Sequence, residues 1–223
     1  IVVLNKETLN IYRKKFNLSL NKLHLIKNGV NINFFKRFKK IRKKKYFKIG
    51  MACRVNKLKK YDLILDSLLS KDVKNLKIKF SLAGLGEDLE KFKKRIITNK
   101  LNDKIKLEGN LNQVELRKWY NSLDLYIQAS VGEGMSMSIL EAMAMKVPVI
   151  GSNVTGIKNI LGKEKFLGLL FNNKIKDLSK KIKYFYYLNN NLKSKYINTQ
   201  YNYIKKNNNS ENLFKKYLSI IKN

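Results

Sequence analysis

Cysteine, histidine and proline are almost missing from this chain of 223 residues, which has one of each. The lone Cys53 excludes a disulfide framework and a cysteine-ligated zinc site, and the lone His24 argues against a histidine-based triad or a multi-histidine metal site. The longest apolar run is far shorter than the roughly 18 residues that span a bilayer. We expect no signal segment at the start. Because residue 1 is Ile rather than Met, we also expect the chain to be a fragment or a processed product.

Acidic residues are scarce as well. The chain has 16 Asp and Glu against 48 Lys and Arg, which gives a net charge of +32, and only six of the basic residues are Arg. Such a charge attracts nucleic acid or an anionic membrane. However, Asn, Ile, Phe and Tyr are abundant together with Lys, which is what AT-biased coding produces. The charge therefore fits either compositional drift or a selected polyanion-binding surface.

What the chain has is a regular alternation of strand and helix patterns, with enough apolar residues (44%) for a core. Strand patterns cover 47–53, 76–83, 104–107, 124–128 and 147–150, and helix patterns cover 61–70, 87–99, 112–121, 137–145 and most of 174–221. This alternation predicts an α/β fold, a Rossmann-like parallel sheet with helices on both faces. Ahead of it we expect a short strand at 1–4, a helix at 6–16 and a second apolar stretch at 23–26 that ends in a turn at Asn28-Gly29.

A basic run with interleaved aromatic residues separates these two parts, at residues 36–45. It fits a solvated linker, and it also fits a contact with an anionic membrane surface.

Ligands of such sheets bind at the carboxyl ends of the strands, where loops lead into the next helix. The loop after the strand at 47–53 carries Arg54 and Lys59, whose charges suit a phosphate or diphosphate. Gly84 and Gly86 follow the next strand, where they would let a ligand approach the backbone or would simply allow a tight turn.

The segment from Gly132 to Ala144 carries the strongest signal. Glu133 lies in a loop and Glu141 in the helix after it, and the helix N-terminus between them offers amides to an anion or to sugar oxygens. Two carboxylates around an amide cluster are the chemistry expected for a nucleotide-sugar. A structural alternative stays open, because Ser138 and Glu141 have the spacing of a capping box and the methionines of this segment would also suit a core.

Taken together, these segments resemble the donor-binding half of a GT-B glycosyltransferase of the retaining family 4 type (glycosyl transferases group 1). The segments that carry the resemblance are Ile49–Val55 with Lys59, Ala83–Glu87, Ile105–Gly109, Ala129-Ser130, Glu133–Ala144 and Val147–Ser152, with Leu25–Val30 matching the end of the family's N-terminal domain. The resemblance spans roughly residues 1–190, and the two glutamates with the proline-containing segment after them are its most specific part.

The resemblance implies a role for each matching residue. Arg54 and Lys59 would contact the donor diphosphate and neutralise the leaving nucleotide. Glu133 would hold donor-sugar hydroxyls and support catalysis, and Glu141 would accept hydrogen bonds from the ribose. The remaining donor-binding positions are Gly84, Leu107 in the loop that frames the base, and the backbone amides of Gly134, Met135 and Ser136. The family needs no metal, so no cofactor is expected.

The resemblance also implies a division into three parts: residues 1–45 as a remnant of the acceptor domain with a basic linker, 46–190 as the nucleotide-sugar domain, and 191–223 as a helical tail. The implied function is a retaining transferase of the hexosyltransferase type. It would move a sugar to a glycan or lipid-linked acceptor in surface polysaccharide or lipopolysaccharide biosynthesis, in the cytoplasm or at the cytoplasmic membrane face. We expect the fragment alone to bind the donor weakly and not to catalyse transfer. Two alternatives stay open, a basic polyanion-binding or nucleic-acid-binding module and a non-catalytic nucleotide-binding half, although no specific nucleic-acid motif is present.

Overall fold

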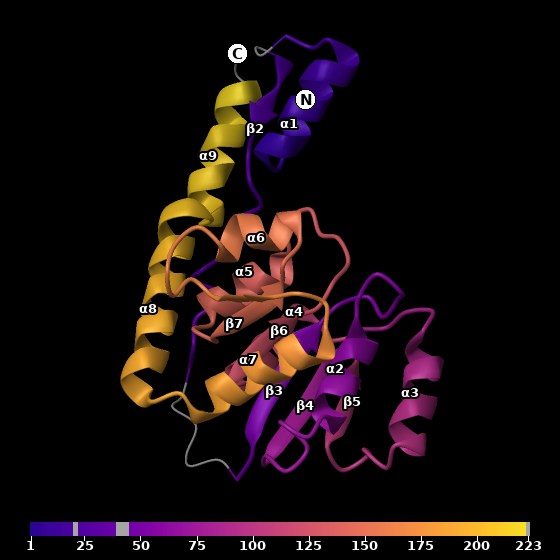
Figure 1. The fold of residues 1–223 in the computed structure, drawn as a ribbon. Coiled ribbons are helices and arrows are strands. Elements are labelled where there is room, and N and C mark those ends of the chain that lie inside the picture. Colours follow the sequence, from indigo (N-terminus) through magenta and orange to yellow (C-terminus); the bar gives the residue numbers. More distant parts are fainter. Residues whose placement is uncertain (20–21, 39–44, 222–223) are drawn as a thin grey trace.

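Six parallel strands form the central sheet of the structure, a computed structural model that describes residues 1–19, 22–38 and 45–221 (Figure 1). The strands are β3 (Phe47–Ala52), β4 (Ile78–Ala83), β5 (Ile105–Gly109), β6 (Leu125–Gln128), β7 (Val149–Ser152) and β8 (Leu169–Phe171), in the spatial order β5-β4-β3-β6-β7-β8. The order reverses between β3 and β6. In doubly wound sheets this switch point is where ligands bind.

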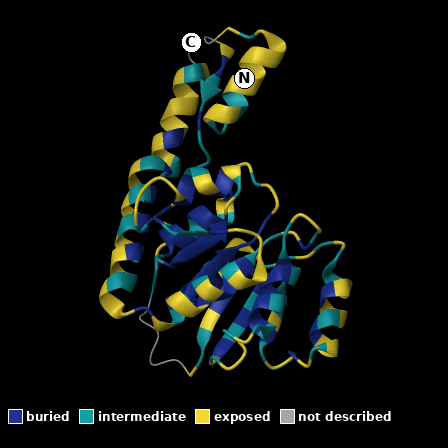
Figure 2. Cartoon of the chain, in the orientation of Figure 1, coloured by how far each residue is buried: buried dark blue, intermediate teal, exposed yellow. Residues whose placement is uncertain are grey.

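Helices cover both faces of the sheet, as the sequence predicts. One face carries α2 (Tyr61–Leu69), α3 (Leu89–Thr98) and α7 (Ile175–Tyr187), and the other carries α4 (Gln113–Ser122), α5 (Met137–Ala144) and α6 (Thr155–Leu161), with α8 (Asn190–Asn207) against α5. Strand β3 shows how alternation builds the two cores. Ile49 and Met51 pack into the first, while Gly50 faces α4, where a Cβ would lie 2.7 Å from Trp119. The strands and the inner sides of the helices are accordingly buried (Figure 2).

The five strand patterns and the helix patterns from residue 47 onward are confirmed within a few residues at each end. Two elements escaped prediction, the seven-residue helix α6 and the three-residue strand β8. The turn predicted at Asn28-Gly29 is wrong. The chain runs straight on there, and glycine is needed because a Cβ on Gly29 would lie 2.8 Å from the Cα of Ser210.

The first residues form a small unit beside the sheet. It consists of β1 (Val2–Val3), α1 (Lys6–Phe16) and β2 (His24–Leu25), with β1 and β2 paired in parallel, and α9 (Ser210–Ile221) runs alongside it (Figure 1). The two chain crossings between this unit and the sheet are joined, because Val30 N–H donates to Asn208 O at 2.8 Å and Ser210 N–H donates to Val30 O at 3.1 Å. The proposed domain boundaries at residues 45 and 190 stay predictions.

Part of the basic run packs against the sheet domain. Residues 39–44 lie outside the described residues, but the aromatic side chains before them contact α4: Phe35 is 5% exposed, and the Arg117 guanidinium lies 5.6 and 4.6 Å from the ring centroids of Phe34 and Phe38. These rings are therefore held by the protein itself. The membrane contact of the run stays a prediction.

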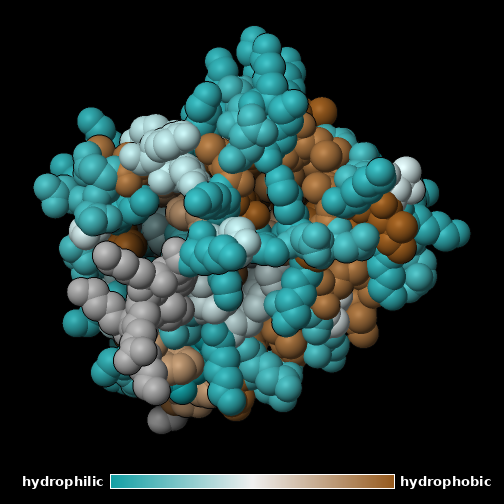
Figure 3. Space-filling view, turned by 90° about the horizontal axis from the view of Figure 1, so that it is seen from below, coloured by the Kyte–Doolittle hydropathy of each residue, from teal (hydrophilic) through white to brown (hydrophobic). Residues whose placement is uncertain are grey.

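The surface shows the basic, polar composition. Seen from below, on the side where β3 begins, hydrophilic side chains surround smaller hydrophobic patches (Figure 3). No helix in the described ranges is both long enough and apolar enough to cross a bilayer.

Candidate functional site

The loops after β3 and β6 meet at the switch point of the sheet. Val131 N–H donates to Leu58 O at 2.9 Å, and Ser130 Oγ donates to the same carbonyl at 3.2 Å. Residues about 70 positions apart in the chain are thereby held side by side, as the parallel topology requires.

An ion pair between Lys59 and Glu133 joins the same two loops. Their side chains are 18% and 17% exposed, so the pair is mostly shielded from water. The structure thus brings together the predicted phosphate-binding lysine and the predicted sugar-binding glutamate.

The backbone of the glutamate loop rests on the first turn of α6. A Cβ on Gly156 would lie 2.0 Å from Glu133 O and 2.3 Å from Gly134 O, distances that no side chain tolerates. Only glycine lets the loop lie this close, so Gly156 determines where Glu133 sits.

Side-chain hydrogen bonds tie the ends of three neighbouring strands. Ser130 N–H donates to Ser152 Oγ at 2.9 Å, Ser152 Oγ donates to Asn173 Oδ1 at 2.7 Å, and Asn173 Nδ2 donates to Ser130 O at 3.0 Å. The ring of bonds fixes the start of the loop that carries Glu133.

Arg54 leaves the same loop as Lys59 but pairs with a different carboxylate. Its Nε lies 3.3 Å from Glu87 Oε2, and both side chains are well exposed, at 74% and 57%. The guanidinium also borders a hollow of about 490 Å³ at the ends of β3, β4 and β5. The hollow is lined by Ala52–Arg54, Ala83–Leu85, Asn110, Leu111 and Leu116.

Gly84 borders this hollow and also meets a packing demand. Its φ is +133°, and a Cβ would lie 1.9 Å from Cys53 O. Gly86 repeats the pattern, with a Cβ position 2.2 Å from Val55 O. The two glycines therefore let the β4 loop pack directly on the β3 loop, and ligand contact at Gly84 stays a prediction.

Glu141 points from α5 toward α4. Tyr120, fully buried, donates its hydroxyl hydrogen bond to Glu141 Oε2 at 3.0 Å. Burial raises the pKa of Glu141 above its usual value, and the hydrogen bond from Tyr120 partly opposes this rise. The capping-box alternative is wrong, because the N-cap of α5 is Ser136 and Ser138 Oγ donates instead to Gln128 Oε1 at 3.1 Å.

The segment from Gly134 to Ser136 lies between the two glutamates. A Cβ on Gly134 would meet nothing within 4 Å, so this turn borders open space. Met135 is anchored from outside the sheet, since Asn28 donates its backbone N–H to Met135 Sδ and its Nδ2 to Met135 O, both at 3.2 Å. Ser136, the N-cap of α5, accepts no capping bond on its side chain, which leaves the amides of the first turn without a side-chain cap.

Leu107 lies elsewhere than expected. It sits inside β5 and packs against the core beside α2 and α3, rather than in a loop. The loop that borders the hollow begins after Gly109 and contributes Asn110 and Leu111.

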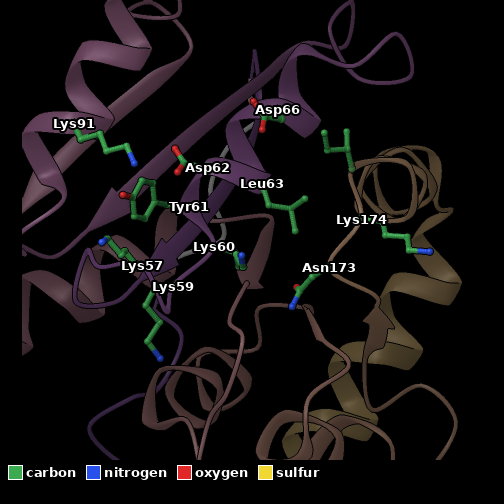
Figure 4. A pocket seen from close by; sticks show the side chains of 11 residues that line it. Lys57, Lys59, Lys60, Tyr61, Asp62, Leu63, Asp66, Lys91, Asn173 and Lys174 are labelled. Atoms are coloured by element: carbon green, nitrogen blue, oxygen red, sulfur yellow. The ribbon is translucent and has the colours of Figure 1, made fainter.

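A second hollow, of about 540 Å³, lies on the other side of the Lys59 loop (Figure 4). Lys57, Lys59, Lys60 and Lys91 are among the residues that line it, and the Lys59 side chain extends away from Tyr61 and pairs with Glu133. Burial raises the pKa of Cys53, which lines the first hollow, to about 12, so its thiol stays protonated and unreactive.

Among the described residues, no group of three or more His, Cys, Asp or Glu is placed to hold a metal ion.

The sequence analysis missed Tyr120, Gly156 and Asn173. Each acts through a partner that is distant along the chain or on another element, so no local motif marks it. A glycine inside a helix can indicate a close approach, but this signal could not be used at Gly156 because helix α6 was not predicted.

A family model described as "Glycosyl transferases group 1" matches residues 33–217 of the chain. The chain belongs to this family. The matched residues include Glu133, Glu141, the Lys59 loop and the whole central sheet of this family member.

Curated relatives are longer than this member of the family. The O-antigen biosynthesis glycosyltransferase WclY of Escherichia coli is 27% identical over 161 residues, which are 69% of this chain and 43% of that protein. The uncharacterized glycosyltransferase MJ1069 of Methanocaldococcus jannaschii is 28% identical over 229 residues, which are 99% of this chain and 57% of that protein. The chain thus spans about half the length of the curated relatives it matches.

Solved structures of glycosyltransferases share the fold. A glycosyltransferase from Rickettsia africae superposes with a TM-score of 0.86 at 21% identity, covering all of this chain and 63% of that one. Anabaena HepE, solved with UDP and glucose, gives a TM-score of 0.84 at 14% identity over 99% of this chain and 62% of that one. These likenesses establish the GT-B type of Rossmann-like fold for the family member described here.

Proposed function

We propose that the chain binds a nucleotide-diphosphate-sugar across the switch point between β3 and β6, as the donor half of a retaining glycosyltransferase. The observation that carries this proposal is the shielded ion pair between Lys59 and Glu133. It holds a cation suited to a phosphate beside a carboxylate suited to sugar hydroxyls, at the carboxyl ends of the two strands where a ligand is expected, and this supports the proposal.

Donor binding would make Lys59 exchange partners. A diphosphate carries more negative charge than one carboxylate, so it competes for the lysine and frees Glu133 to accept hydrogen bonds from sugar hydroxyls. Arg54, which is exposed and pairs with Glu87, can turn to the same diphosphate. Together with the uncapped amides at the start of α5, these cations supply the positive charge that the leaving diphosphate needs, without a metal.

The other parts of the donor would occupy places already described. The ribose hydroxyls would reach Glu141, and the base would enter the hollow of about 490 Å³ bordered by Arg54, Asn110 and Leu111. In the transfer step, the bond between the anomeric carbon and the diphosphate oxygen breaks and the diphosphate leaves with the electron pair. The acceptor hydroxyl then forms the new bond on the same face of the sugar and passes its proton to the leaving diphosphate oxygen.

We further propose a glycan or lipid-linked acceptor and a place of action at the cytoplasmic face of a membrane. The relative WclY is named for O-antigen biosynthesis, which supports a role in the assembly of a surface polysaccharide. Because the relatives are about twice as long, we expect this chain to bind the donor and the remaining length to be needed for transfer.

The proposal is tested by titrating the chain with UDP, GDP and ADP in a calorimeter at two salt concentrations. We expect one nucleotide to bind in a way that persists at the higher salt and is lost in an Arg54→Ala/Glu141→Ala variant. Equal, salt-sensitive binding of all three nucleotides that the variant retains would mean that the net charge of +32 alone attracts them.

A further inference from the structure

Glu141 has one carboxylate oxygen fixed and one open. Oε2 accepts the hydrogen bond from Tyr120, whereas Oε1 accepts none from the described residues and is not among their buried polar atoms that lack a partner. The open oxygen is therefore accessible on a side chain that is otherwise largely buried. The direction in which it points depends on what holds Oε2.

The Tyr120 ring that holds Oε2 cannot move freely. Its centroid lies 5.0 Å from that of Trp119, 5.7 Å from that of Tyr126 and 6.3 Å from that of Phe35, and the residue is fully buried. Three aromatic neighbours from different parts of the chain thus fix the position of the hydroxyl.

The single hydroxyl proton has two acceptors within reach. Glu141 Oε2 lies 3.0 Å away and Ser138 O lies 3.2 Å away. The carboxylate is charged and is the stronger acceptor, so the proton goes to Glu141.

We propose that Tyr120 is a positioning residue for nucleotide binding: it orients Glu141 so that Oε1 faces the ribose diol of the donor. The inference rests on the proposed function, because it assigns the ribose to Glu141. Tyr120 does not itself touch the nucleotide. Its effect passes through the carboxylate.

The same hydrogen bond helps to keep Glu141 ionised. Burial raises the pKa of Glu141 and the bond from Tyr120 lowers it. Among the residues that the structure describes, the titratable side chains that face the carboxylate are Tyr120 on α4 and Tyr126 on β6, and burial raises the pKa of both hydroxyls, so they stay neutral. Removing the Tyr120 hydroxyl should therefore move the pKa of Glu141 further upward.

The test is Tyr120→Phe, which keeps the ring and its packing and removes one oxygen. With UDP as the probe in calorimetry at pH 7.5, we expect affinity to fall about tenfold, as if the hydrogen bond from the ribose to the misoriented Glu141 carboxylate were lost. The pH below which binding weakens should move upward, since Glu141 takes up its proton earlier. Tyr196→Phe is the matched control, because it removes the hydroxyl of another buried tyrosine, on α8, and should leave UDP affinity unchanged.

Three results would overturn the inference. The first is equal UDP affinity in the wild type and in Tyr120→Phe. The second is a loss of UDP affinity in Tyr196→Phe as large as that in Tyr120→Phe. The third is a loss of UDP affinity on adding Tyr120→Phe to Glu141→Ala as large as the loss in the wild type, because an effect that acts through Glu141 must vanish in that background. A wild type that binds none of UDP, GDP and ADP would refute the proposed function instead. In that case the carboxyl ¹³C resonance of Glu141, followed against pH, still reports on the hydrogen bond from Tyr120 to Glu141. An unchanged midpoint of the Glu141 titration in Tyr120→Phe would contradict the effect of this hydrogen bond on the pKa.

Discussion

Gly156 gives the sharpest prediction, because its contacts define how far the site must move. In Gly156→Ala the new Cβ would lie 2.0 Å from Glu133 O and 2.3 Å from Gly134 O, although Cβ atoms in proteins essentially never come within 3.0 Å of such atoms. The glutamate loop and the first turn of α6 must therefore separate by about 1 Å. Overpacking of this kind costs about 1–3 kcal/mol of folding free energy when the backbone cannot yield. Since the loop borders open space at Gly134, we expect it to yield and the stability loss to be near the low end.

The functional loss should be larger than the loss of stability suggests. The displaced loop also carries the Gly134–Ser136 amides that are proposed to contact the diphosphate, so we expect UDP to bind about tenfold more weakly to Gly156→Ala. Calorimetric titration measures the affinity, and thermal unfolding measured in parallel shows that the chain is still folded.

Lys158→Ala serves as the control for Gly156→Ala. It alters an exposed position of the same short helix, away from the glutamate loop, and should change neither quantity appreciably. UDP binding to Gly156→Ala with wild-type affinity would refute the reasoning, because it would show that the position of the Gly134–Ser136 backbone does not matter for the nucleotide.

Three further variants test other parts of the structure. Lys59→Ala leaves the loop glutamate without its cation in a shielded place, so we expect a loss of about 1–3 kcal/mol in the free energy of unfolding and weaker UDP binding, measured by denaturant unfolding and calorimetry. Arg95→Ala removes the ion pairs with Asp62 and Asp66, each 2.7 Å away, and these side chains are about one-third exposed. We expect the free energy of unfolding to fall by about 1 kcal/mol or less and UDP affinity to stay unchanged. An altered UDP affinity would contradict this expectation. Glu141→Gln should stabilise the folded chain at pH 7, whereas the two variants above should destabilise it. Because burial raises the pKa of Glu141 above 4.5, the folded chain binds this proton more tightly than the unfolded chain, so the wild type loses stability as the pH rises through the raised pKa. Glu141→Gln should therefore unfold at a higher temperature at pH 7, lose this advantage below pH 4.5, and bind UDP more weakly; equal melting temperatures at pH 7 would contradict the pKa shift.

The elements that could be predicted are those whose local pattern and tertiary role agree. Strand β3 alternates between two cores and helix α3 has a clear apolar face, so periodicity finds both. The elements that escaped are short. Helix α6 has seven residues and its N-terminal turn contains Gly156, and β8 has three residues and follows Phe166, whose φ is +68°. Their formation depends on packing with β7 more than on their own propensity.

Some residues of the site could likewise be predicted from the sequence, whereas their contacts could not. Glu133 and Lys59 could be predicted because each follows a buried strand, where ligand-binding residues are expected, and the topology then brings them together. That they pair with each other could not, because it needs the register of loops that are 74 positions apart. Tyr120 was hidden for a similar reason. A tyrosine on the apolar side of a helix is ordinarily a core residue, and only its contact with Glu141 distinguishes it.

The contacts of Met135 have a mechanical consequence. The chain passes between the outlying unit and the sheet twice, near Asn28 and near Asn208, and Asn208 Nδ2 donates to Asn28 O at 2.7 Å. Asn28 in turn holds both the sulfur and the carbonyl of Met135, in the segment between the two glutamates. The crossing is therefore bonded directly to the loop between the two glutamates. Any rotation of β1, α1 and α9 relative to the sheet must either break these bonds or pull the loop along, so the position of the outlying unit and the shape of the site are linked through a single methionine.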